Sequence, residues 1–393
     1  MMNRQLPRTP YPHSIKSLFK AALNRQRNEI YKNELIEYIG CEDGILTRSG
    51  REAFYYILKT FLEEGDEIII PVFSCNVLIG AISKAKVKPV FVDVDKSTLN
   101  LTIGSIKKKK TVKTKAVLLT HQFGYISDPS EIIHYCRVNK LLIIEDAAPA
   151  LGAMYRSFRA GTIGSVSFFS FQFSKVVSSV KGGFIAGKKR FVQKINEKFP
   201  KERTEKPSKP IVDAIKYKII LTPVIYFALL KIWYLIYNDF SSAHFLNLEE
   251  TLYNDNEIVH LSEFQAALGF EQLKQIENIL SIRKKAAFEL ISTLRSNNEV
   301  LEILQPIKQG EDCIHTYSRF SILVKDKQTF YKYCNKHGLD LGFTFSYLLS
   351  DYYGISRKEF PNSKYIAEHI LNIPIYLSDK LNKNINLILK AIS

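Results

Sequence analysis

Leu141-Leu142-Ile143-Ile144-Glu145-Asp146 and Val166-Ser167-Phe168-Phe169-Ser170-Phe171-Gln172-Phe173-Ser174-Lys175 are the two stretches that decide the fold. Apolar residues continue through both runs without strict polar alternation, which is typical of strands buried in a parallel sheet. One run ends in an aspartate and the other in a lysine. Open α/β sheets bind ligands at the carboxyl ends of such strands. We therefore expect Asp146 and Lys175 to face a ligand site.

This pair of side chains suits one cofactor, pyridoxal phosphate (PLP). The aldehyde of PLP forms a Schiff base with a lysine, and its pyridinium nitrogen pairs with an aspartate. Asp146 would keep the ring nitrogen protonated, so that the ring draws electrons from the α-carbon of the substrate. By itself the pair fits two ordinary solvated strand ends equally well. The surrounding sequence distinguishes the two interpretations.

Six motifs follow one another along the chain. They are Ser49-Gly50-Arg51-Glu52-Ala53, Pro71-Val72-Phe73-Ser74-Cys75, Pro89-Val90-Phe91-Val92-Asp93-Val94-Asp95, Glu145-Asp146-Ala147-Ala148-Pro149-Ala150-Leu151-Gly152-Ala153, Gly161-Thr162-Ile163-Gly164 with Phe169–Lys175, and Ser262-Glu263-Phe264-Gln265-Ala266-Ala267-Leu268-Gly269 with Gln272-Leu273. In this order and spacing they resemble the DegT/StrS-type nucleotide-sugar aminotransferases, a branch of the fold-type-I PLP enzymes. The resemblance covers residues 45–187 well and residues 255–340 more loosely.

The resemblance implies roles for individual residues. Lys175 would form the Schiff base and Asp146 would pair with the pyridine nitrogen, so these two are the catalytic candidates. The candidates for cofactor binding are Gly50, Arg51, Cys75, Asp146, Ala148, Ser170 and Lys175. Gly50 and Arg51 would offer the backbone amides of a helix N-terminus to the phosphate, and Ser170 would add a hydroxyl. No spacing of cysteines and histidines predicts a metal site.

Several positions depart from the family pattern. Pro149 stands where a polar side chain is common, and Cys75 where an aromatic ring often stacks on the cofactor. Ile258-Val259-His260 replaces a segment in which many members carry an asparagine and an arginine that reach the neighbouring subunit's phosphate. Lys181 stands where an acidic residue is common. A lone histidine at a strand end, His121, is more often structural than catalytic.

The chain reads as an α/β protein of the PLP-dependent transferase fold type I, with a mostly parallel sheet sandwiched by helices and a smaller α+β C-terminal domain. A turn at Ser49-Gly50 leads into a helix within 47–60. The strands we expect are Glu67–Phe73, Pro89–Val94, Ala116–Gln122, Leu141–Asp146, Val166–Phe171 and Gly183–Ala186. The charged, proline-rich run 199–210 predicts an exposed linker. We place the large domain at 1–254 and the small domain, helical through 296 and then mixed, at 255–393.

The function implied is transfer of an amino group, from L-glutamate as the expected donor, to a keto sugar linked to a nucleotide, for surface polysaccharide biosynthesis. The expected assembly is a homodimer with active sites at the subunit interface. Relatives that dehydrate sugars typically have histidine at the lysine position, so Lys175 favours transamination. Two alternatives stay open: a dehydratase-like enzyme, and a PLP-fold protein that binds or regulates without catalysis.

Composition is that of an ordinary globular protein, with 46% hydrophobic and 24% charged residues among 393. The odd number of cysteines, five, without a close Cys-x-x-Cys pair, and a start without an apolar signal core, indicate the cytoplasm. The net charge of +16 raises the question of nucleic acid. The one dense basic run, 107–110, has no interleaved aromatic residues and predicts a solvated loop instead.

Residues 211–240 form an unusually apolar segment. Twelve residues without charge lie between Lys218 and Lys231, and the run Ile232-Trp233-Tyr234-Leu235-Ile236-Tyr237 follows. A membrane-spanning helix needs about 20 apolar residues, so spanning is not expected. The favoured interpretation is a helical hairpin packed in the core or at a dimer contact. The alternative is peripheral contact with the inner face of a membrane, with Trp233 and the lysines at the headgroups.

Overall fold

The computed structural model describes residues 5–9, 11–24, 27–237, 257–295, 297–304 and 313–391. Residues 238–240, the end of the apolar segment 211–240, lie outside this description.

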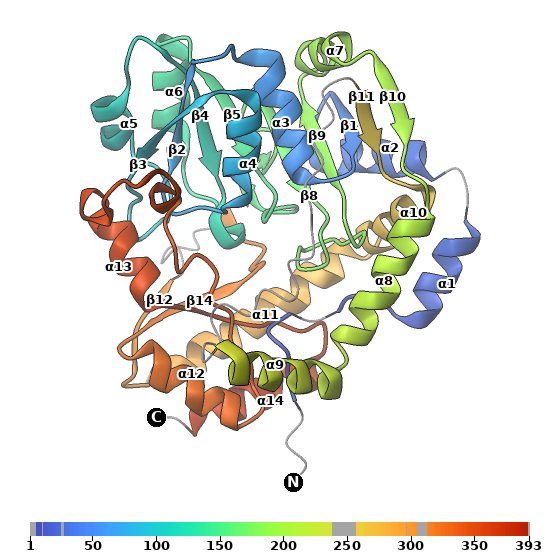
Figure 1. Ribbon diagram of the computed structural model, residues 1–393, viewed down its shortest axis with the longest axis vertical. Coiled ribbons are helices and arrows are strands. Elements are labelled where there is room, and N and C mark those ends of the chain that lie inside the picture. Colours follow the sequence, from blue (N-terminus) through green and yellow to red (C-terminus); the bar gives the residue numbers. More distant parts are fainter. Residues whose placement is uncertain are drawn as a thin grey trace.

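Seven strands of the described chain form one central sheet in the order β1-β9-β8-β5-β4-β2-β3 (Figure 1). Their bounds are β1 Asp43–Thr47, β2 Glu67–Pro71, β3 Lys88–Val92, β4 Thr114–Thr120, β5 Leu142–Asp146, β8 Val166–Ser170 and β9 Gly183–Gly187. The pairs from β8 to β3 are parallel, whereas β9 runs antiparallel to both β8 and β1. All six expected strands are confirmed to within a few residues. Strand β1 was not predicted.

Helices cover both faces of this sheet, as expected. Side chains alternate between the faces of a strand, and β2 shows the result: Ile68 and Ile70 join the main hydrophobic core, while Ile69 packs in a separate cluster on the other face. The covering helices are α2 Asn28–Ile39, α3 Gly50–Phe61, α4 Val77–Ala85, α5 Ile103–Lys109, α6 Ser130–Val138 and α7 Lys189–Lys198. The basic run 107–110 closes α5, so the expectation of a loop is wrong. Cations in the last turn complement the helix dipole, and these lysines stay exposed up to Lys109.

A second, three-stranded antiparallel sheet lies in the C-terminal part. It has the order β12-β14-β15, with β12 Val300–Leu304, β14 Phe320–Val324 and β15 Ile370–Ile373. Helices α11 Ile276–Leu294, α12 Lys327–Lys336, α13 Pro361–His369 and α14 Asp379–Lys390 belong to the same part of the molecule (Figure 1). The division of the chain at 254 and 255 stays a prediction.

The run 199–210 is not a linker. Residues 201–204 form an exposed strand, β10 Lys201–Thr204, which pairs in parallel with β11 Glu257–His260. Strand β11 also corrects the expectation of an all-helical pattern from residue 255, since helix α10 Glu263–Leu273 begins only after it. Three short strands, β6 Met154–Tyr155, β7 Phe158–Arg159 and β13 Cys313–Ile314, make a further small sheet.

The apolar segment forms two helices, α8 Ser208–Ile220 and α9 Pro223–Tyr237. The first of them lies near the N-terminal helix α1 Ile15–Leu23 (Figure 1). Within the described residues, no single helix has the length and apolar composition to cross a membrane. Helices α8 and α9 have the required length and composition only when they are taken together, and the chain bends by 80° between them.

Candidate active site

Asp146 is the last residue of β5 and lies buried between two neighbouring strands. Its backbone pairs in register with Thr120 of β4 and Phe168 of β8. Its carboxylate accepts one hydrogen bond from the described residues, from the amide of Ala148 at 3.1 Å, and forms no ion pair with them. Burial raises the pKa of Asp146, and the nearby Lys175 opposes that shift. A buried carboxylate held by one amide is suited to a cationic N–H partner.

Lys175 lies in the loop between β8 and β9 rather than at the strand end, because β8 stops at Ser170. A hydrogen bond of 2.9 Å from its amide to the carbonyl of Gln172 makes the turn that carries it. Burial lowers the pKa of the Lys175 amine, with a further lowering from Arg319, against the opposing effects of Cys75 and Asp146. An amine of lowered pKa is partly neutral and therefore nucleophilic.

The N-terminus of α3 packs directly against the end of β8. Ser49 caps the helix by accepting a hydrogen bond from the amide of Glu52. A Cβ added to Gly50 would lie 2.9 Å from Cβ of Ser170 and 3.0 Å from the carbonyl oxygen of Phe169, so only glycine allows this approach. Backbone amides at a helix start next to a serine hydroxyl can bind a phosphate.

Cys75 connects this helix start to the proposed catalytic pair. The thiol lies close enough to Lys175, Asp146 and Arg51 for their charges to act on it, while burial raises its pKa. Gly50 also lies close to Ser170, and Ala148 donates a hydrogen bond to Asp146. All seven predicted residues therefore lie in one region. Their individual roles in binding and catalysis stay proposals.

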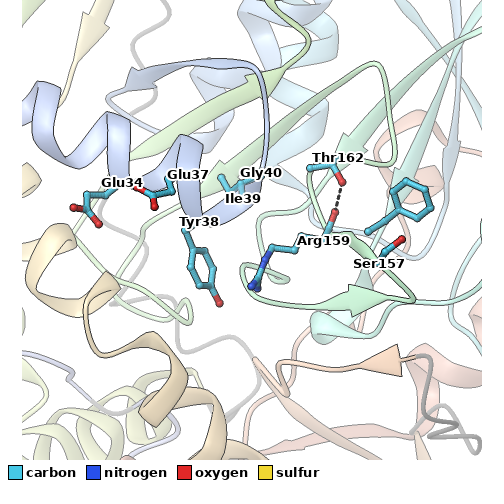
Figure 2. A pocket seen from close by; sticks show the side chains of 9 residues that line it. Glu34, Glu37, Tyr38, Ile39, Gly40, Ser157, Arg159 and Thr162 are labelled. Carbon is cyan, nitrogen blue, oxygen red and sulfur yellow. Dashed lines mark hydrogen bonds between the residues drawn. The ribbon is translucent and has the colours of Figure 1, made fainter.

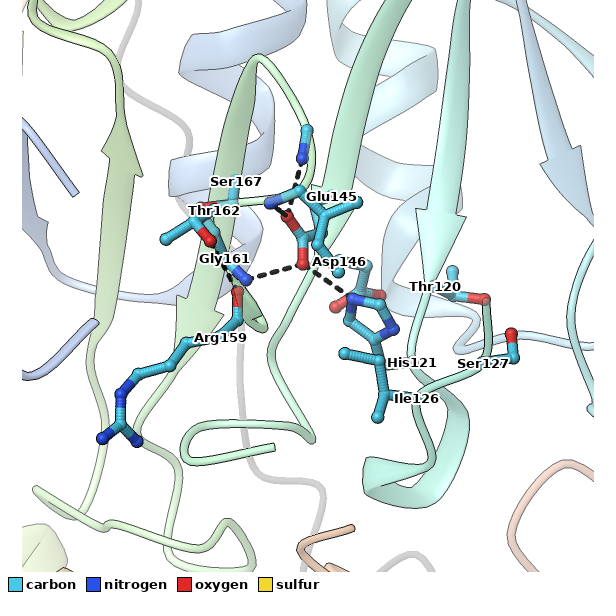
Figure 3. Close-up of polar contacts among 12 residues, drawn as sticks. Thr120, His121, Ile126, Ser127, Glu145, Asp146, Arg159, Gly161, Thr162 and Ser167 are labelled. Carbon is cyan, nitrogen blue, oxygen red and sulfur yellow. Dashed lines mark hydrogen bonds and ion pairs between the residues drawn. The ribbon is translucent and has the colours of Figure 1, made fainter. Parts of the chain in front are cut away.

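A buried network behind Asp146 was not predicted (Figure 3). Glu145, fully buried, accepts hydrogen bonds from the amides of Gly161 at 2.6 Å, Ile163 at 3.0 Å and Gly164 at 2.9 Å. Nε2 of His121 lies 2.7 Å from the same carboxylate. His121 thus contacts a structural carboxylate, and its charge also acts on Asp146. The sequence signal was the glutamate inside an apolar strand, since a buried charge needs such partners.

A cavity of about 290 Å³ opens at Lys175. Arg8, Arg283 and Arg319 line it, and the sequence had pointed to none of them. Arg8 forms an ion pair of 2.6 Å with buried Asp340, and Arg283 donates to the carbonyl of Tyr317 at 3.0 Å. Arg319 has no acceptor for its guanidinium among the described residues, and burial lowers its pKa. The cavity therefore presents uncompensated positive charge.

The departures from the family pattern have structural partners in this chain. Ile258 and Val259 are fully buried in β11, while His260 contacts the carbonyl of Leu46 at 2.7 Å. Lys181 forms an ion pair of 3.1 Å with Asp213 of α8. The side chains of Ile258 and His260 therefore contact residues of their own chain.

A larger hollow, of about 620 Å³, lies between α2 and the β6–β7 region (Figure 2). Glu34, Glu37, Tyr38 and Arg159 line it, and none of the predicted site residues does. In the described part of the chain, no group of three or more His, Cys, Asp or Glu side chains could hold a metal ion.

The residues present fit PLP. A buried carboxylate with a single donor suits the ring nitrogen, an amine of lowered pKa lies within its electrostatic range, and a glycine approach leaves a helix start open to a phosphate. All of these groups come from one chain, and their chemistry is what PLP requires.

Comparison with known proteins identifies the family of the chain. The sequence profile described as the DegT/DnrJ/EryC1/StrS aminotransferase family matches residues 20–202 and 255–390. GDP-perosamine synthase of Escherichia coli O157:H7 is 25% identical over 296 residues, which cover 75% of this chain and 69% of that protein. GDP-4-keto-6-deoxy-D-mannose 3-dehydratase of Yersinia pseudotuberculosis is 29% identical over 162 residues, 39% of this chain and 41% of that one.

The fold has solved counterparts. Helicobacter pylori PseC, an aminotransferase involved in the biosynthesis of pseudoaminic acid, superposes with a TM-score of 0.76 at 16% identity, covering 99% of each chain. Other structures of this fold were solved in PLP and PMP forms.

Proposed function

The chain belongs to the DegT/DnrJ/EryC1/StrS aminotransferase family, and from this membership we propose that it transfers an amino group to a keto sugar carried on a nucleotide. Its fold is fold type I and its cofactor is PLP. Relatives named for nucleotide-linked sugars support the substrate class. Surface polysaccharide is the destination we propose for the amino sugar.

The observation that carries the proposal is the proximity of Lys175 and Asp146. When bound, PLP supplies an electron sink that weakens the bond between the donor's α-carbon and its hydrogen. Asp146 would hold positive charge on the ring nitrogen, which keeps that sink effective. The amine of Lys175, with its lowered pKa, would take the proton from the α-carbon and return it in the second half of the reaction.

L-Glutamate is the donor we propose. Arg319 and Arg283 supply positive charge in the cavity that contains Lys175. Burial, and after it repulsion by Arg319, lowers the pKa of Arg283 to about 10, and a bound carboxylate would relieve that repulsion. A carboxylate that meets a guanidinium away from bulk water gains a strong, charge-assisted hydrogen bond.

A dehydratase is the alternative, because one of the similar proteins carries that name. The family resemblance associates dehydration with histidine in place of the lysine, and this chain has Lys175. The lysine therefore supports transamination. A binding or regulatory protein without catalysis would have no need of an amine of lowered pKa beside a buried carboxylate.

We propose a homodimer that works in the cytoplasm. Fold-type-I relatives place their active sites between two subunits. The five cysteines are free thiols, which suits a reducing compartment. If light scattering shows a monomer and that monomer has full turnover, the dimer is contradicted. Peripheral contact with the inner face of a membrane is proposed through α8 and α9.

The decisive experiment mixes the PLP-loaded protein with L-glutamate and nucleotide-linked 4-keto-6-deoxy sugars, and measures 2-oxoglutarate together with the amino sugar. We expect both products in equal amounts, and loss of both by at least about a thousandfold (about 4 kcal/mol of barrier) in Lys175→Ala. Lys181→Ala, also in the loop that precedes β9, is the control and should keep most activity. Loss of the keto sugar without an amino product would favour the dehydratase instead.

A further inference from the structure

Helices α8 and α9 pack against the molecule by one side only. Tyr217, Tyr226 and Leu230 are at most 2% exposed and belong to one small hydrophobic cluster, to which α10 also contributes. The opposite sides carry apolar side chains that are 39–73% exposed. These are Val212, Ile215 and Ile219 on α8, and Val224, Ile225, Ile232, Leu235 and Ile236 on α9. Of the expected packing in the core or at a dimer contact, the core part holds for the inner sides, and a dimer contact of the outer sides stays a prediction.

Helix α1, which lies near α8 in Figure 1, carries a third apolar stripe. Ile15, Phe19 and Leu23 recur every four residues, lie on one face of the helix and are 67–74% exposed. Ala21 of α1 is buried in the cluster that also holds the inner sides of α8 and α9. We call the exposed faces of α1, α8 and α9 the three-helix face.

The charges of the three-helix face are almost all positive. Exposed lysines on these helices are Lys16, Lys20, Lys209, Lys216 and Lys231, of which Lys20 forms an ion pair of 2.9 Å with Glu271 of α10. These helices carry a single acidic side chain, Asp213, which is already paired with Lys181. Two copies of such a face would repel each other, whereas an anionic surface would attract it. The charge pattern thus argues against self-association and for anionic lipid.

The three-helix face is held firmly to the rest of the protein. Tyr226 of α9 donates a hydrogen bond of 2.6 Å to buried Asp340, and Tyr11 donates one of 2.8 Å to the carbonyl of Ala214 in α8. Nζ of Lys218 reaches the carbonyl of His13 at 3.3 Å. The apolar side chains are therefore presented by a fixed scaffold, so they cannot turn inward to escape water without breaking these bonds.

We propose that the three-helix face is a monotopic docking surface, which rests the protein on an anionic lipid bilayer. The apolar side chains would enter the boundary between headgroups and acyl chains, and the lysines would meet the anionic headgroups. No described helix is both long and apolar enough to span, and two helices bent by 80°, as α8 and α9 are, can both lie in the plane of the interface. This surface is independent of the transamination proposed above.

Cosedimentation with vesicles tests the proposal on the full PLP-loaded chain. We expect binding to phosphatidylcholine vesicles that contain phosphatidylglycerol, weaker binding as salt is added, and little binding to phosphatidylcholine alone. Trp233, the only tryptophan, lies on the inner side of α9 with its indole nitrogen buried, so binding is read from the vesicle pellet and not from emission.

Substitutions separate the face from the rest of the surface. The triple variant Val212→Ser, Ile215→Ser and Ile219→Ser should lower the partition coefficient at least about tenfold, because it removes a complete apolar stripe. It should keep its helical content and its transaminase turnover. Val138→Ser, at an equally exposed site on α6, is the matched control and should bind as wild type does.

Two results would overturn the proposal. One is the absence of any vesicle binding at low salt. The other is light scattering in which the wild type forms a larger assembly than the triple variant while neither binds vesicles, since the face would then join copies of this chain. If the triple variant does not fold, cosedimentation of the wild type with and without anionic lipid still decides between these outcomes.

Discussion

At the scale of single residues, burial shifts the two central charges toward their neutral forms. The pKa of Asp146 is raised and that of Lys175 is lowered, each chiefly because its side chain is desolvated. Each group therefore gains from a partner that the bound cofactor brings, a ring cation for the carboxylate and an aldehyde for the amine. The guanidinium of Arg319, which has no acceptor among the described residues, would likewise gain a partner from an anionic group of the substrate.

Asp146→Asn should keep the fold and the cofactor but lower turnover by about a hundredfold or more, roughly 3 kcal/mol of barrier, because an amide cannot stabilise charge on the ring nitrogen. Absorbance of the bound cofactor and single-turnover rates measure the two effects separately. Asp128→Asn, a change of the same kind at an exposed turn, should leave both untouched. An unchanged rate in Asp146→Asn would show that another group serves the nitrogen.

Arg319→Gln should raise the KM for L-glutamate by about tenfold to a hundredfold, roughly 1.4–2.8 kcal/mol, because it removes a charge-assisted hydrogen bond to a carboxylate. The KM for the nucleotide sugar should stay within about twofold of the wild-type value. Arg190→Gln on the exposed side of α7 is the control. If the KM of the nucleotide sugar rises instead, Arg319 meets the diphosphate and not the donor.

At the scale of elements, one carboxylate determines where β8 begins. The three amides that Glu145 binds belong to residues 161–164, the turn that leads into β8. Successive residues of a strand point to opposite faces. Glu145 therefore holds this turn from one side of β5 while its neighbour Asp146 points the other way.

Glu145→Gln should lower the free energy of unfolding by about 3 kcal/mol, since the new amide hydrogens would face backbone N–H groups that need an acceptor. Chemical denaturation measures this loss. The affinity for PLP should fall with it, because the turn before β8 is released. Glu131→Gln, exposed on α6, should change stability by less than about 0.5 kcal/mol. Equal stability of both variants would remove Glu145 from this role.

At the scale of the whole molecule, segments far apart in the sequence meet around the cavity at Lys175. Asp340 accepts hydrogen bonds from Tyr226 and Tyr331 at 2.6 Å each, and it pairs with Arg8. The N-terminal segment, α9 and the C-terminal part are thereby held by a single buried carboxylate. Changes in α9 can reach the cavity through this contact.

Acid should destabilise the molecule through His13 and His315. Burial lowers the pKa of each to about 4 from the ordinary 6.5, so the unfolded chain binds more protons below pH 6.5. The stability contribution is complete above about pH 6.5 and is lost as the pH falls toward 4, by about 3 kcal/mol per histidine.

Urea midpoints measured between pH 7.5 and 4 check this pH dependence. His315→Gln should flatten the curve, while His134→Gln, exposed on α6, should leave it as in the wild type. A wild-type midpoint that does not change over this range would contradict the assignment.

The central strands and the proposed catalytic pair could be predicted because their signals are local. Unbroken apolar runs predicted the buried strands, and Asp146 and Lys175 follow directly from where two of those runs end. Ser49 and Gly50 predict the start of α3, because a serine side chain can accept a hydrogen bond from an amide in the first turn of a helix. These patterns depend only on residues that are adjacent in sequence, so they can be recognised without knowing how the chain packs.

Only the tertiary structure could bring Arg319 to Lys175, join Glu145 to the turn at 161–164, and leave one side of α8 and α9 in water. The reason is physical. The partner of a buried charge, and the side of an apolar helix that becomes covered, depend on segments distant in sequence, and their approach is set by the packing of the whole core. An all-round apolar helix such as α9 carries no pattern that says which of its sides stays exposed.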